Sequence, residues 1–320
     1  MNSLLLLSSL AFSQNIVGGQ PADDGDWPDV AALFYGDAMG CTGVLIAPSV
    51  VLTAGHCDYG RLTHVRLNSV DYTVEGEQIA VQSVTAYPDY LTSFDLAVIV
   101  LAEPARTPFR VIAQDCILDR HLEDGAPATI AGYGATDNYG RDFGTHLNVA
   151  DITIDDAACT DLAAGCLPDI SPGGEVGAGA KEDADTCQGD SGGPLILNTE
   201  DGDFLLGITS RGYAGAWPPC GPGGIYARPD AVIGWIEETA GVTLARPDCG
   251  VRIGSGRVWG DLQAIVTDDG GDSGEMDVNV DSDEPRSEPP GGCSAISSIG
   301  LRAWIFGMLF IGTRRRHSGV

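Results

Sequence analysis

The stretch Asp185-Thr-Cys-Gln-Gly-Asp-Ser-Gly-Gly-Pro194 places one serine among glycines, acids and a cysteine. Glycines allow the backbone to form a tight turn whose N–H groups point at a single substrate atom. Ser191 is therefore the candidate nucleophile. Because a serine hydroxyl is a poor nucleophile at neutral pH, this interpretation requires a histidine base elsewhere in the chain and an acid that orients it.

Two upstream stretches supply these partners. His56 lies in the sequence Leu52-Thr-Ala-Gly-His-Cys57, and a disulfide from Cys57 to Cys41 would fix the loop that presents the imidazole. Histidine suits proton transfer near neutrality. Asp95 precedes the apolar run of residues 96–101, where a carboxylate is costly unless it has a partner such as an imidazolium. Asp95 is thus the candidate orienting acid.

The composition indicates a folded, acidic protein. The chain has 320 residues, of which 43% are hydrophobic and 19% charged, an ordinary globular balance. A net charge of −28 with only 17 Lys and Arg argues against nucleic acid as a partner, because phosphate binding needs clustered cations. Nine cysteines after an apolar leader indicate an oxidising compartment, with one cysteine left unpaired.

Short apolar runs separated by Gly and Pro recur along the chain and predict an all-β sandwich or barrel. The predicted strands are 30–35, 43–47, 63–67, 79–84, 96–101, 128–133, 195–197 and 204–209. Only residues 231–240 show helical spacing of apolar side chains. The predicted architecture is β structure followed by one C-terminal helix.

Four motifs occur in an order that is highly specific. They are Ile16-Val-Gly-Gly19, Thr53-Ala-Gly-His-Cys57, Asp95-Leu-Ala97 and Gly189-Asp-Ser-Gly-Gly-Pro194. In this order and spacing, residues 16–240 resemble the trypsin and chymotrypsin family of serine proteases. The resemblance implies two packed six-stranded antiparallel β-barrels with the active site between them, and no cofactor.

The resemblance also implies a role for each residue of the motifs. Ser191 would attack the scissile carbonyl, His56 would take and return its proton, and Asp95 would hold the histidine tautomer. The backbone N–H groups of Gly189 and Ser191 would form the oxyanion hole. The implied reaction is hydrolysis of a peptide bond through an acyl-enzyme.

The same resemblance implies a specificity pocket. Asp185 stands six residues before Ser191, where trypsin-like members carry the acid that pairs with a substrate Arg or Lys. Gly212 and Gly224 match the glycines that keep the pocket open, and Ser210 leads the strand that pairs with the substrate backbone. We therefore expect cleavage after Arg or Lys, with Asp183 as the alternative acid if the loop register differs.

Activation is expected to follow the family pattern. A freed amine at Ile16 would pair with Asp190, the acid before the nucleophile, and this ion pair would shape the oxyanion hole. Gln14-Asn15 precedes Ile16, with no Arg or Lys for a trypsin-like activator. We expect signal peptidase or a small trimming step to expose Ile16, so that little stable zymogen exists.

The sequence departs from the family at several positions. Arg211 stands where relatives usually carry an aromatic residue, and it places a positive charge beside the predicted pocket, where it would alter subsite preference or act electrostatically on Asp185. Phe94 replaces a common asparagine. The loop with Asp71, Glu75 and Glu77 is shorter than the family's calcium loop and lacks its full set of oxygen ligands, so no metal site is expected.

The cysteines can be assigned in the frame of the resemblance. It implies the pairs Cys41–Cys57 and Cys187–Cys220. In the same frame Cys159–Cys166 would close a shortened loop, and Cys116–Cys249 remains as the last pair of the body. Cys293 is the odd cysteine.

The ends of the chain predict export and attachment. Residues 1–15 are interpreted as a signal peptide with a short pro-segment, cleaved near Ser13, and the alternative is a buried first strand. Residues 16–244 form the predicted protease domain, and residues 245–292 an acidic linker, rich in Asp, Glu, Gly and Ser from 267 to 288. Within the linker range, residues 251–266 carry some apolar side chains, and an additional strand there is the alternative. The remaining segment, 293–320, is interpreted as a sorting or membrane-anchor segment.

That last segment has the features of a membrane signal. Its apolar stretch 295–313 would span about 28 Å as a helix, near the thickness of a bilayer core, although Arg302 adds a cost within it. Arg314-Arg-Arg-His317 follows it and fits a cytoplasmic end. Together with Gly-Gly-Cys293 this resembles bacterial myxosortase-type sorting signals, with a plain single-pass anchor as the alternative.

The sequence thus predicts a monomeric endopeptidase that acts on proteins or peptides with Arg or Lys at the cleaved position. It would be secreted and retained at a bacterial cell surface through its C-terminal segment, which would contact the membrane or a sorting enzyme. Two other functions stay open at this stage: an inactive module that binds a basic ligand, and an esterase that uses the same triad.

Overall fold

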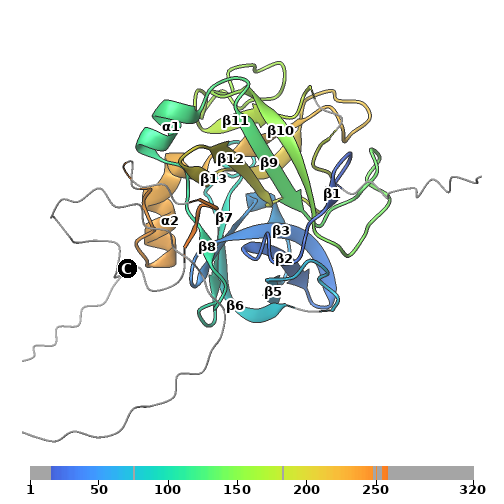
Figure 1. Cartoon of the computed structure of the whole chain (residues 1–320), viewed down its shortest axis with the longest axis vertical. Helices are drawn as coiled ribbons and strands as arrows, with labels where there is room; N and C mark the ends of the chain where they lie inside the picture. Colours follow the sequence, from blue (N-terminus) through green and yellow to red (C-terminus); the bar gives the residue numbers. More distant parts are fainter. Residues whose placement is uncertain (1–15, 75, 182–183, 248–249, 251–253, 259–320) are drawn as a thin grey trace, which may run out of the picture. The chain divides into compact units, whose positions relative to one another are not determined.

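The computed structural model describes residues 16–74, 76–181, 184–247, 250 and 254–258, which form two β-barrels (Figure 1). Several sequence predictions fall outside these residues and are not addressed by the structure. They are the signal segment 1–15, Glu75, Asp183, Cys249, Cys293 and the C-terminal segment.

The first barrel is closed by six antiparallel strands in the order β2-β3-β4-β7-β6-β5. Its strands are β2 (Val30–Tyr35), β3 (Ala38–Ala47), β4 (Val50–Thr53), β5 (His64–Leu67), β6 (Glu77–Ala86) and β7 (Ala97–Leu101). A short 3₁₀ helix, η1 (Gly55–Cys57), follows β4 and carries the His-Cys pair.

The second barrel has six strands, closed where β10 pairs with both β9 and β11, with a short seventh strand, β1, added at β10. Its strands are β1 (Gln20–Pro21), β9 (Pro127–Gly132), β10 (Asn148–Asp156), β11 (Glu175–Ala178), β12 (Pro194–Thr199), β13 (Gly202–Gly212) and β14 (Gly224–Ala227). The predicted all-β architecture of two six-stranded barrels is confirmed.

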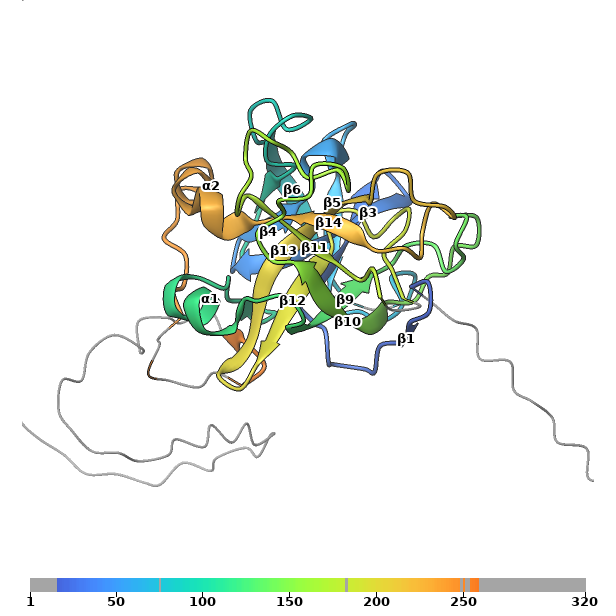
Figure 2. The same cartoon turned by 90° about the horizontal axis from the view of Figure 1, so that it is seen from above.

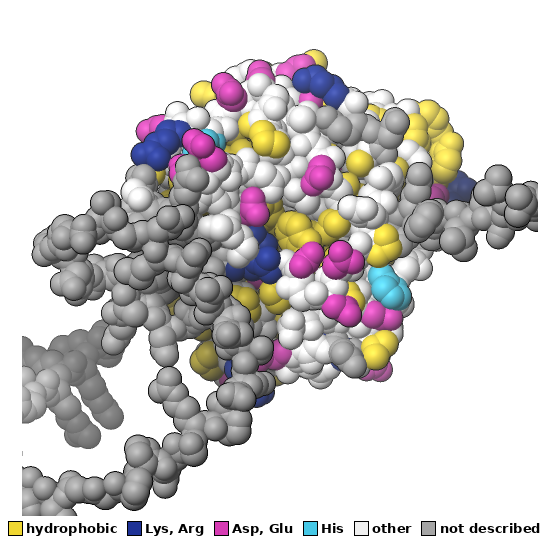
Figure 3. All heavy atoms as spheres, viewed as in Figure 1, with side chains coloured by type: hydrophobic (Ala, Val, Ile, Leu, Met, Phe, Trp, Pro, Cys, Tyr) yellow, Lys and Arg dark blue, Asp and Glu magenta, His cyan; other side chains and the backbone are white. Residues whose placement is uncertain are grey.

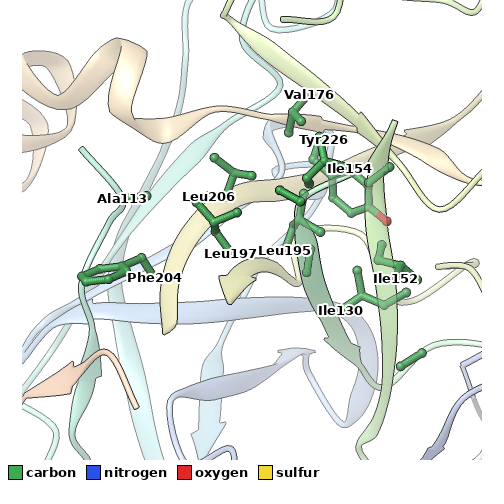
Figure 4. Close-up of a cluster of buried hydrophobic side chains, with 14 of the residues drawn as sticks. Ala113, Ile130, Ile152, Ile154, Val176, Leu195, Leu197, Phe204, Leu206 and Tyr226 are labelled. Carbon is green, nitrogen blue, oxygen red and sulfur yellow. The ribbon is translucent and has the colours of Figure 1, made fainter. Parts of the chain in front are cut away.

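Inward-pointing apolar side chains fill the second barrel, as Figure 4 shows. Ile130, Ile152, Leu195 and Leu206 come from four different strands and are almost completely buried. Each such side chain contributes roughly 1.5–3 kcal/mol by leaving water. The alternation of inward and outward residues in β10 follows from the two-residue period of a strand, with every second side chain in the core.

Each predicted strand overlaps an observed one, but the barrel strands β4, β10, β11 and β14 were missed, as were the strands of only two residues. β10 carries three aspartates that interrupt its apolar pattern. β11 and β14 are only four residues long, and each contains a glycine. Their pairing is supplied by neighbours far away in the sequence, since β11 pairs with both β10 and β14. Local pattern alone therefore could not reveal them.

The predicted helix at 231–240 is present as a 3₁₀ turn, η2 (Pro229–Val232), followed by α2 (Ile233–Ala240). The expectation of a single helix was wrong, because α1 (Asp115–His121) is a second one. Seven residues with one fully buried side chain are too short to show helical periodicity. Both helices lie on the same side of the barrels in Figures 1 and 2.

The chain continues to pack on this body after α2. β15 (Arg257–Val258) pairs with β8 (Phe109–Arg110), which lies between the barrels in the sequence. The Arg110 guanidinium is 2% exposed, donates to Asp29 at 2.7 and 3.1 Å, and reaches the Ser255 carbonyl at 2.7 Å. Residues 254–258 thus belong to the packed body, although they fall in the segment predicted to be linker.

Acidic side chains are scattered over the face of the molecule seen in Figure 3, in keeping with the net charge of −28. In the part of the chain that the structure describes, no helix has both the length and the apolar character needed to cross a membrane.

Candidate active site

His56 and Asp95 form a close pair on the first barrel. His56 Nδ1 lies 2.8 Å from Asp95 Oδ2, and the His56 backbone N–H donates to Asp95 Oδ1 at 2.9 Å. Two contacts to one carboxylate fix both the η1 backbone and the ring. With the ring proton on Nδ1, Nε2 is left as a proton acceptor.

The Asp95 carboxylate is buried, with 8% of the residue exposed, and Ser210 Oγ of β13 donates to its Oδ2 at 2.7 Å. Burial raises the pKa of Asp95, but the hydrogen bonds and charge of His56 and the Ser210 hydroxyl outweigh it, so the pKa lies below its usual range. The acid is therefore ionised where it contacts the imidazole.

Ser191 approaches this pair from the second barrel. Its carbonyl accepts a hydrogen bond from the Thr42 backbone N–H at 2.9 Å, and it lies 3.7 Å from the sulfur of Cys57, the neighbour of His56. Thr42 also binds the other side of the turn, because its Oγ1 donates to the Gly189 carbonyl at 2.9 Å. One residue of the first barrel thereby holds the nucleophile turn of the second.

The turn itself requires glycine. Gly189 has φ of +99°, and a Cβ there would lie 2.8 Å from Gly134 Cα. Gly192 has φ of +83°, and its Cβ would lie 2.0 Å from Thr53 Oγ1. In the described residues no acceptor is bound by the N–H groups of Gly189 and Ser191. Both donors are thus available to a substrate oxygen.

Asp185, the predicted pocket acid, is 1% exposed. Its Oδ2 accepts N–H groups from Gly221 and Gly223 at 2.7 and 3.2 Å, while its Oδ1 has no hydrogen-bond partner in the described structure. Burial raises the pKa of Asp185 to about 6. The hydroxyl of Tyr226, also buried, is likewise without a partner there.

The two glycines predicted to line the specificity pocket lie close to backbone carbonyls. A Cβ at Gly224 would lie 2.8 Å from the Arg211 carbonyl, and one at Gly212 would come to 3.4 Å from the Pro219 carbonyl. The disulfide Cys187–Cys220 joins the turn that carries Ser191 to the loop that also carries Gly221. The role of these glycines in a substrate pocket stays a prediction.

Ile16 and Asp190 are both completely buried. Asp190 Oδ1 accepts the Gly134 N–H at 2.7 Å, and Oδ2 accepts the Cys187 N–H at 2.8 Å. Burial, with a further contribution from the charge of Asp185, raises the pKa of Asp190 to about 7 against these hydrogen bonds. In the described part of the chain no side-chain cation contacts it. The nitrogen of Ile16 is an amide here, joined to Asn15.

Three of the predicted disulfides are present: Cys41–Cys57, Cys159–Cys166 and Cys187–Cys220. Cys116 is also disulfide-bonded. Its predicted pairing with Cys249 remains a prediction, because Cys249 lies outside the described residues.

Arg211 makes no contact with Asp185 in the described structure, and its expected electrostatic effect on that acid stays a prediction. Its guanidinium Nη1 lies 2.7 Å from Glu175 Oε1, and Nη2 donates to the Gly165 carbonyl at 2.8 Å. A buried acid on β11 is a stronger partner than the pocket carboxylate, which is already bound by backbone N–H groups. Phe94 packs edge-on against Tyr87.

The loop compared with a calcium site has other contacts. Glu77 accepts the backbone N–H groups of Arg106 and Thr107 at 3.0 and 3.2 Å, and the Thr107 hydroxyl at 2.8 Å. Asp71 accepts the Thr73 N–H at 3.0 Å and its hydroxyl at 2.7 Å. These carboxylates stabilise the local turns of the first barrel.

Sequence reasoning missed three residues of this site: Thr42, Glu175 and Tyr226. Glu175 had a signal, since it is a single acid that opens the short run Glu175-Val-Gly-Ala178. The argument that identified Asp95, that an acid leading into a buried strand needs a partner, applies equally to it. Thr42 and Tyr226 have no comparable signal, because neither side chain is charged.

Comparison with known proteins agrees with this geometry. The family model described as "Trypsin" matches residues 16–236. Human Kallikrein-8 is 33% identical over 248 residues, covering 73% of this chain and 89% of that protein. "Trypsin" from Saccharopolyspora erythraea is 34% identical over 233 residues, covering 70% of this chain and 97% of that protein. A solved structure of neuropsin, described as a serine protease expressed in the limbic system of mouse brain, has a TM-score of 0.57 at 30% identity and covers 69% of this chain and 98% of its own.

Proposed function

The chain belongs to the trypsin family of serine proteases, and from this premise we propose that it cleaves peptide bonds after Arg or Lys through Ser191, His56 and Asp95. It is a serine endopeptidase by family. The single observation that carries the proposed triad is the His56–Asp95 pair at 2.8 Å with the Ser191 backbone packed against the neighbouring Cys57.

The proposed reaction begins when Ser191 Oγ attacks the scissile carbonyl and His56 Nε2 takes its proton. Asp95, ionised and held by Ser210, stabilises the imidazolium that forms. His56 then gives the proton to the leaving amine, and water repeats the sequence on the acyl-enzyme. The N–H groups of Gly189 and Ser191 stabilise the oxyanion, and loss of one such donor costs about 3 kcal/mol of transition-state stabilisation.

Preference for Arg or Lys is proposed from the unpaired oxygen of Asp185. A buried carboxylate with one free oxygen is an unfavourable arrangement that a substrate guanidinium or ammonium would relieve. Neutral side chains would leave that carboxylate unpaired and would be rejected by several kcal/mol. Gly212 and Gly224 carry no side chain that would block a long substrate side chain from reaching it.

Activation is proposed to require a free amine at Ile16. An ammonium on this buried residue would give Asp190 the cation that it lacks, and it would fix the turn that holds Gly189. Signal peptidase or a short trimming step would generate it, since no basic residue precedes Ile16. N-terminal sequencing of the secreted protein checks this, and a fully active enzyme that retains Gln14 contradicts it.

The location is proposed to be outside the cell. The apolar leader before residue 16 and the segment 293–320 support secretion followed by attachment at a bacterial surface, although both lie outside the described residues. Cell fractionation tests this proposal with the full chain and with a chain that stops before Cys293. Release of only the shortened protein into the medium is the expected result, and equal release of both is the contrary one.

The proposed function is tested with matched peptides that differ only at the residue before the cleaved bond. We expect turnover with Arg and Lys that disappears in Ser191→Ala. Turnover with another preference would retain the protease and reject the assignment of Asp185. If a folded protein with a free Ile16 amine cleaves no peptide, the protein is instead a binding module. Turnover of small esters alone would indicate an esterase.

A further inference from the structure

Arg211 of β13 makes three contacts that link the catalytic region to β11. Its Nη1 lies 2.7 Å from Glu175 Oε1 and donates to Ser210 Oγ at 3.1 Å, while Nη2 donates to the Gly165 carbonyl at 2.8 Å. The side chain is only 32% exposed. The guanidinium is therefore directed into the protein rather than toward solvent.

Glu175 holds this guanidinium in place. Its side chain is 1% exposed, and Oε2 accepts the Leu167 N–H at 2.8 Å. Oε1 has no aligned hydrogen bond in the described structure, so its stabilisation comes from the charge of Arg211. A buried carboxylate needs such a partner, and the pair is consequently fixed in one geometry.

The contact with Ser210 determines where the Ser210 proton points. A serine hydroxyl has one O–H donor, and a guanidinium can only donate. Because Arg211 Nη1 donates to Ser210 Oγ, the hydroxyl proton must be directed at another acceptor. That acceptor is Asp95 Oδ2, at 2.7 Å. The chain of contacts thus runs from Glu175 through Arg211 and Ser210 to the acid of the proposed triad.

We propose that Arg211, held by Glu175, is a positioning residue for the reaction: it orients the Ser210 hydroxyl toward Asp95 and places a compensated positive charge beside the Asp95–His56 pair. This inference rests on the proposed triad. It differs from the expectation that Arg211 acts on the pocket acid, because no contact joins Arg211 to Asp185 in the described structure.

The first test is the pH dependence of kcat/KM. Two sets of titratable or charged groups lie near the Asp95–His56 pair in the described structure. Tyr90 lies against Gly55, the residue before His56, and the Arg211–Glu175 pair acts through Ser210. Glu175→Gln leaves the positive charge of Arg211 uncompensated, which disfavours protonation of the Asp95–His56 pair. Arg211→Met leaves the negative charge of Glu175 uncompensated, which favours protonation of that pair.

The two single variants are therefore expected to move the acid limb of the pH profile in opposite directions. The limb moves to lower pH in Glu175→Gln and to higher pH in Arg211→Met, each by roughly half a unit to one unit. Matched controls are Glu237→Gln and Arg246→Met, which alter another Arg–Glu pair, 2.9 Å apart, by the same charges. Neither control residue has a contact with Asp95, His56 or Ser210, and their profiles should match that of the wild type.

The second test separates positioning from charge. The double variant Arg211→Met/Glu175→Gln removes both charges and leaves no buried ion unpaired, so it is expected to fold even if Arg211→Met does not. Its acid limb should return near that of the wild type, while kcat falls about tenfold and KM changes less than about threefold, since Ser210 has lost its orienting donor. Arg211→Lys keeps a charged donor and should recover most of kcat.

Each outcome decides the inference. Opposite shifts of the acid limb, with a loss of kcat that lysine rescues, support it. Unchanged pH profiles in folded variants, or equal shifts in the Glu237 and Arg246 controls, overturn it and leave Arg211 with a purely structural role. If Arg211→Met does not fold, the Glu175→Gln profile and the kcat of the double variant decide. Absence of turnover in the wild type refutes the proposed function instead.

Discussion

Freeing the amine of Ile16 is expected to stabilise the folded protein at neutral pH. Asp190 is completely buried and, in the uncleaved chain, is held only by the N–H groups of Gly134 and Cys187. Burial raises its pKa from 3.8 to about 7. Ile16 is completely buried and its neighbour Val17 forms a β-bridge with Asp185, so we expect cleavage before Ile16 to supply an ammonium to the carboxylate that lacks a cation.

The size of the effect follows from the pKa of Asp190. A shift of about three units at 1.36 kcal/mol per unit corresponds to about 4 kcal/mol. The folded uncleaved protein binds the proton more tightly than the unfolded chain. The stabilisation from the protonated Asp190 carboxyl is therefore fully present below pH about 4, and it is lost as the pH rises toward about 7. The two forms should differ by up to about 4 kcal/mol at pH 7 and converge near pH 4.

Urea unfolding at pH 4 to 8 measures this difference. The chain that begins at Ile16 is compared with one that begins at Gln14, both carrying Ser191→Ala to prevent self-cleavage. Asp190→Asn in both forms is the control, because it removes the carboxylate that the amine would pair with. Equal unfolding free energies at pH 7, or a difference that persists with Asp190→Asn, would refute the proposed ion pair.

Three further outcomes are expected. Because the pKa of Asp185 is about 6, KM for Arg peptides should rise as the pH falls below 6. KM for a peptide with a neutral side chain at the cleaved position, measured with the same enzyme, should not show this rise. Parallel pH dependences of the two KM values would argue against Asp185 as the pocket acid. Gly189→Ala should lower kcat at least tenfold, since φ of +99° and the 2.8 Å approach to Gly134 exclude a side chain, and a normal kcat in steady-state kinetics would contradict this. Arg110→Met should destabilise the fold by up to about 3–5 kcal/mol in urea unfolding, because the buried Asp29 loses its hydrogen-bonded arginine and keeps only Arg257 Nη1 at 3.8 Å. Arg110→Met/Asp29→Asn should recover part of that loss, and a single variant as stable as the wild type would refute the reasoning.

The parts of the site that sequence reasoning reached are those whose chemistry is visible locally. Asp95 could be assigned because an acid before a continuous apolar strand needs a partner, and its contacts with His56 provide one. The glycines around Ser191 could be assigned because a tight turn that exposes N–H groups needs positive φ, which Gly189 and Gly192 adopt. Both arguments use a local physical requirement.

What the sequence could not supply was the pairing of distant residues. Arg211 and Glu175 are 36 positions apart, and the local sequence around one residue does not identify the other as its partner. Their contact depends on β14 lying between β11 and β13 in the second barrel. The same holds for β11 itself, a four-residue strand whose place is fixed by its neighbours rather than by its own pattern.

The buried acids of this protein can be separated by what neutralises them. Asp29 and Glu175 each contact an arginine of the same chain, so their charges are compensated before any ligand arrives. Asp185 and Asp190 have raised pKa values, and in the described structure both are bound by backbone N–H groups without a cation. A buried carboxylate in that state is a site where a cation from elsewhere gains the most. For Asp185 that cation would be a substrate side chain, and for Asp190 the amine released at Ile16, so binding and activation would use the same electrostatic principle at two acids five residues apart.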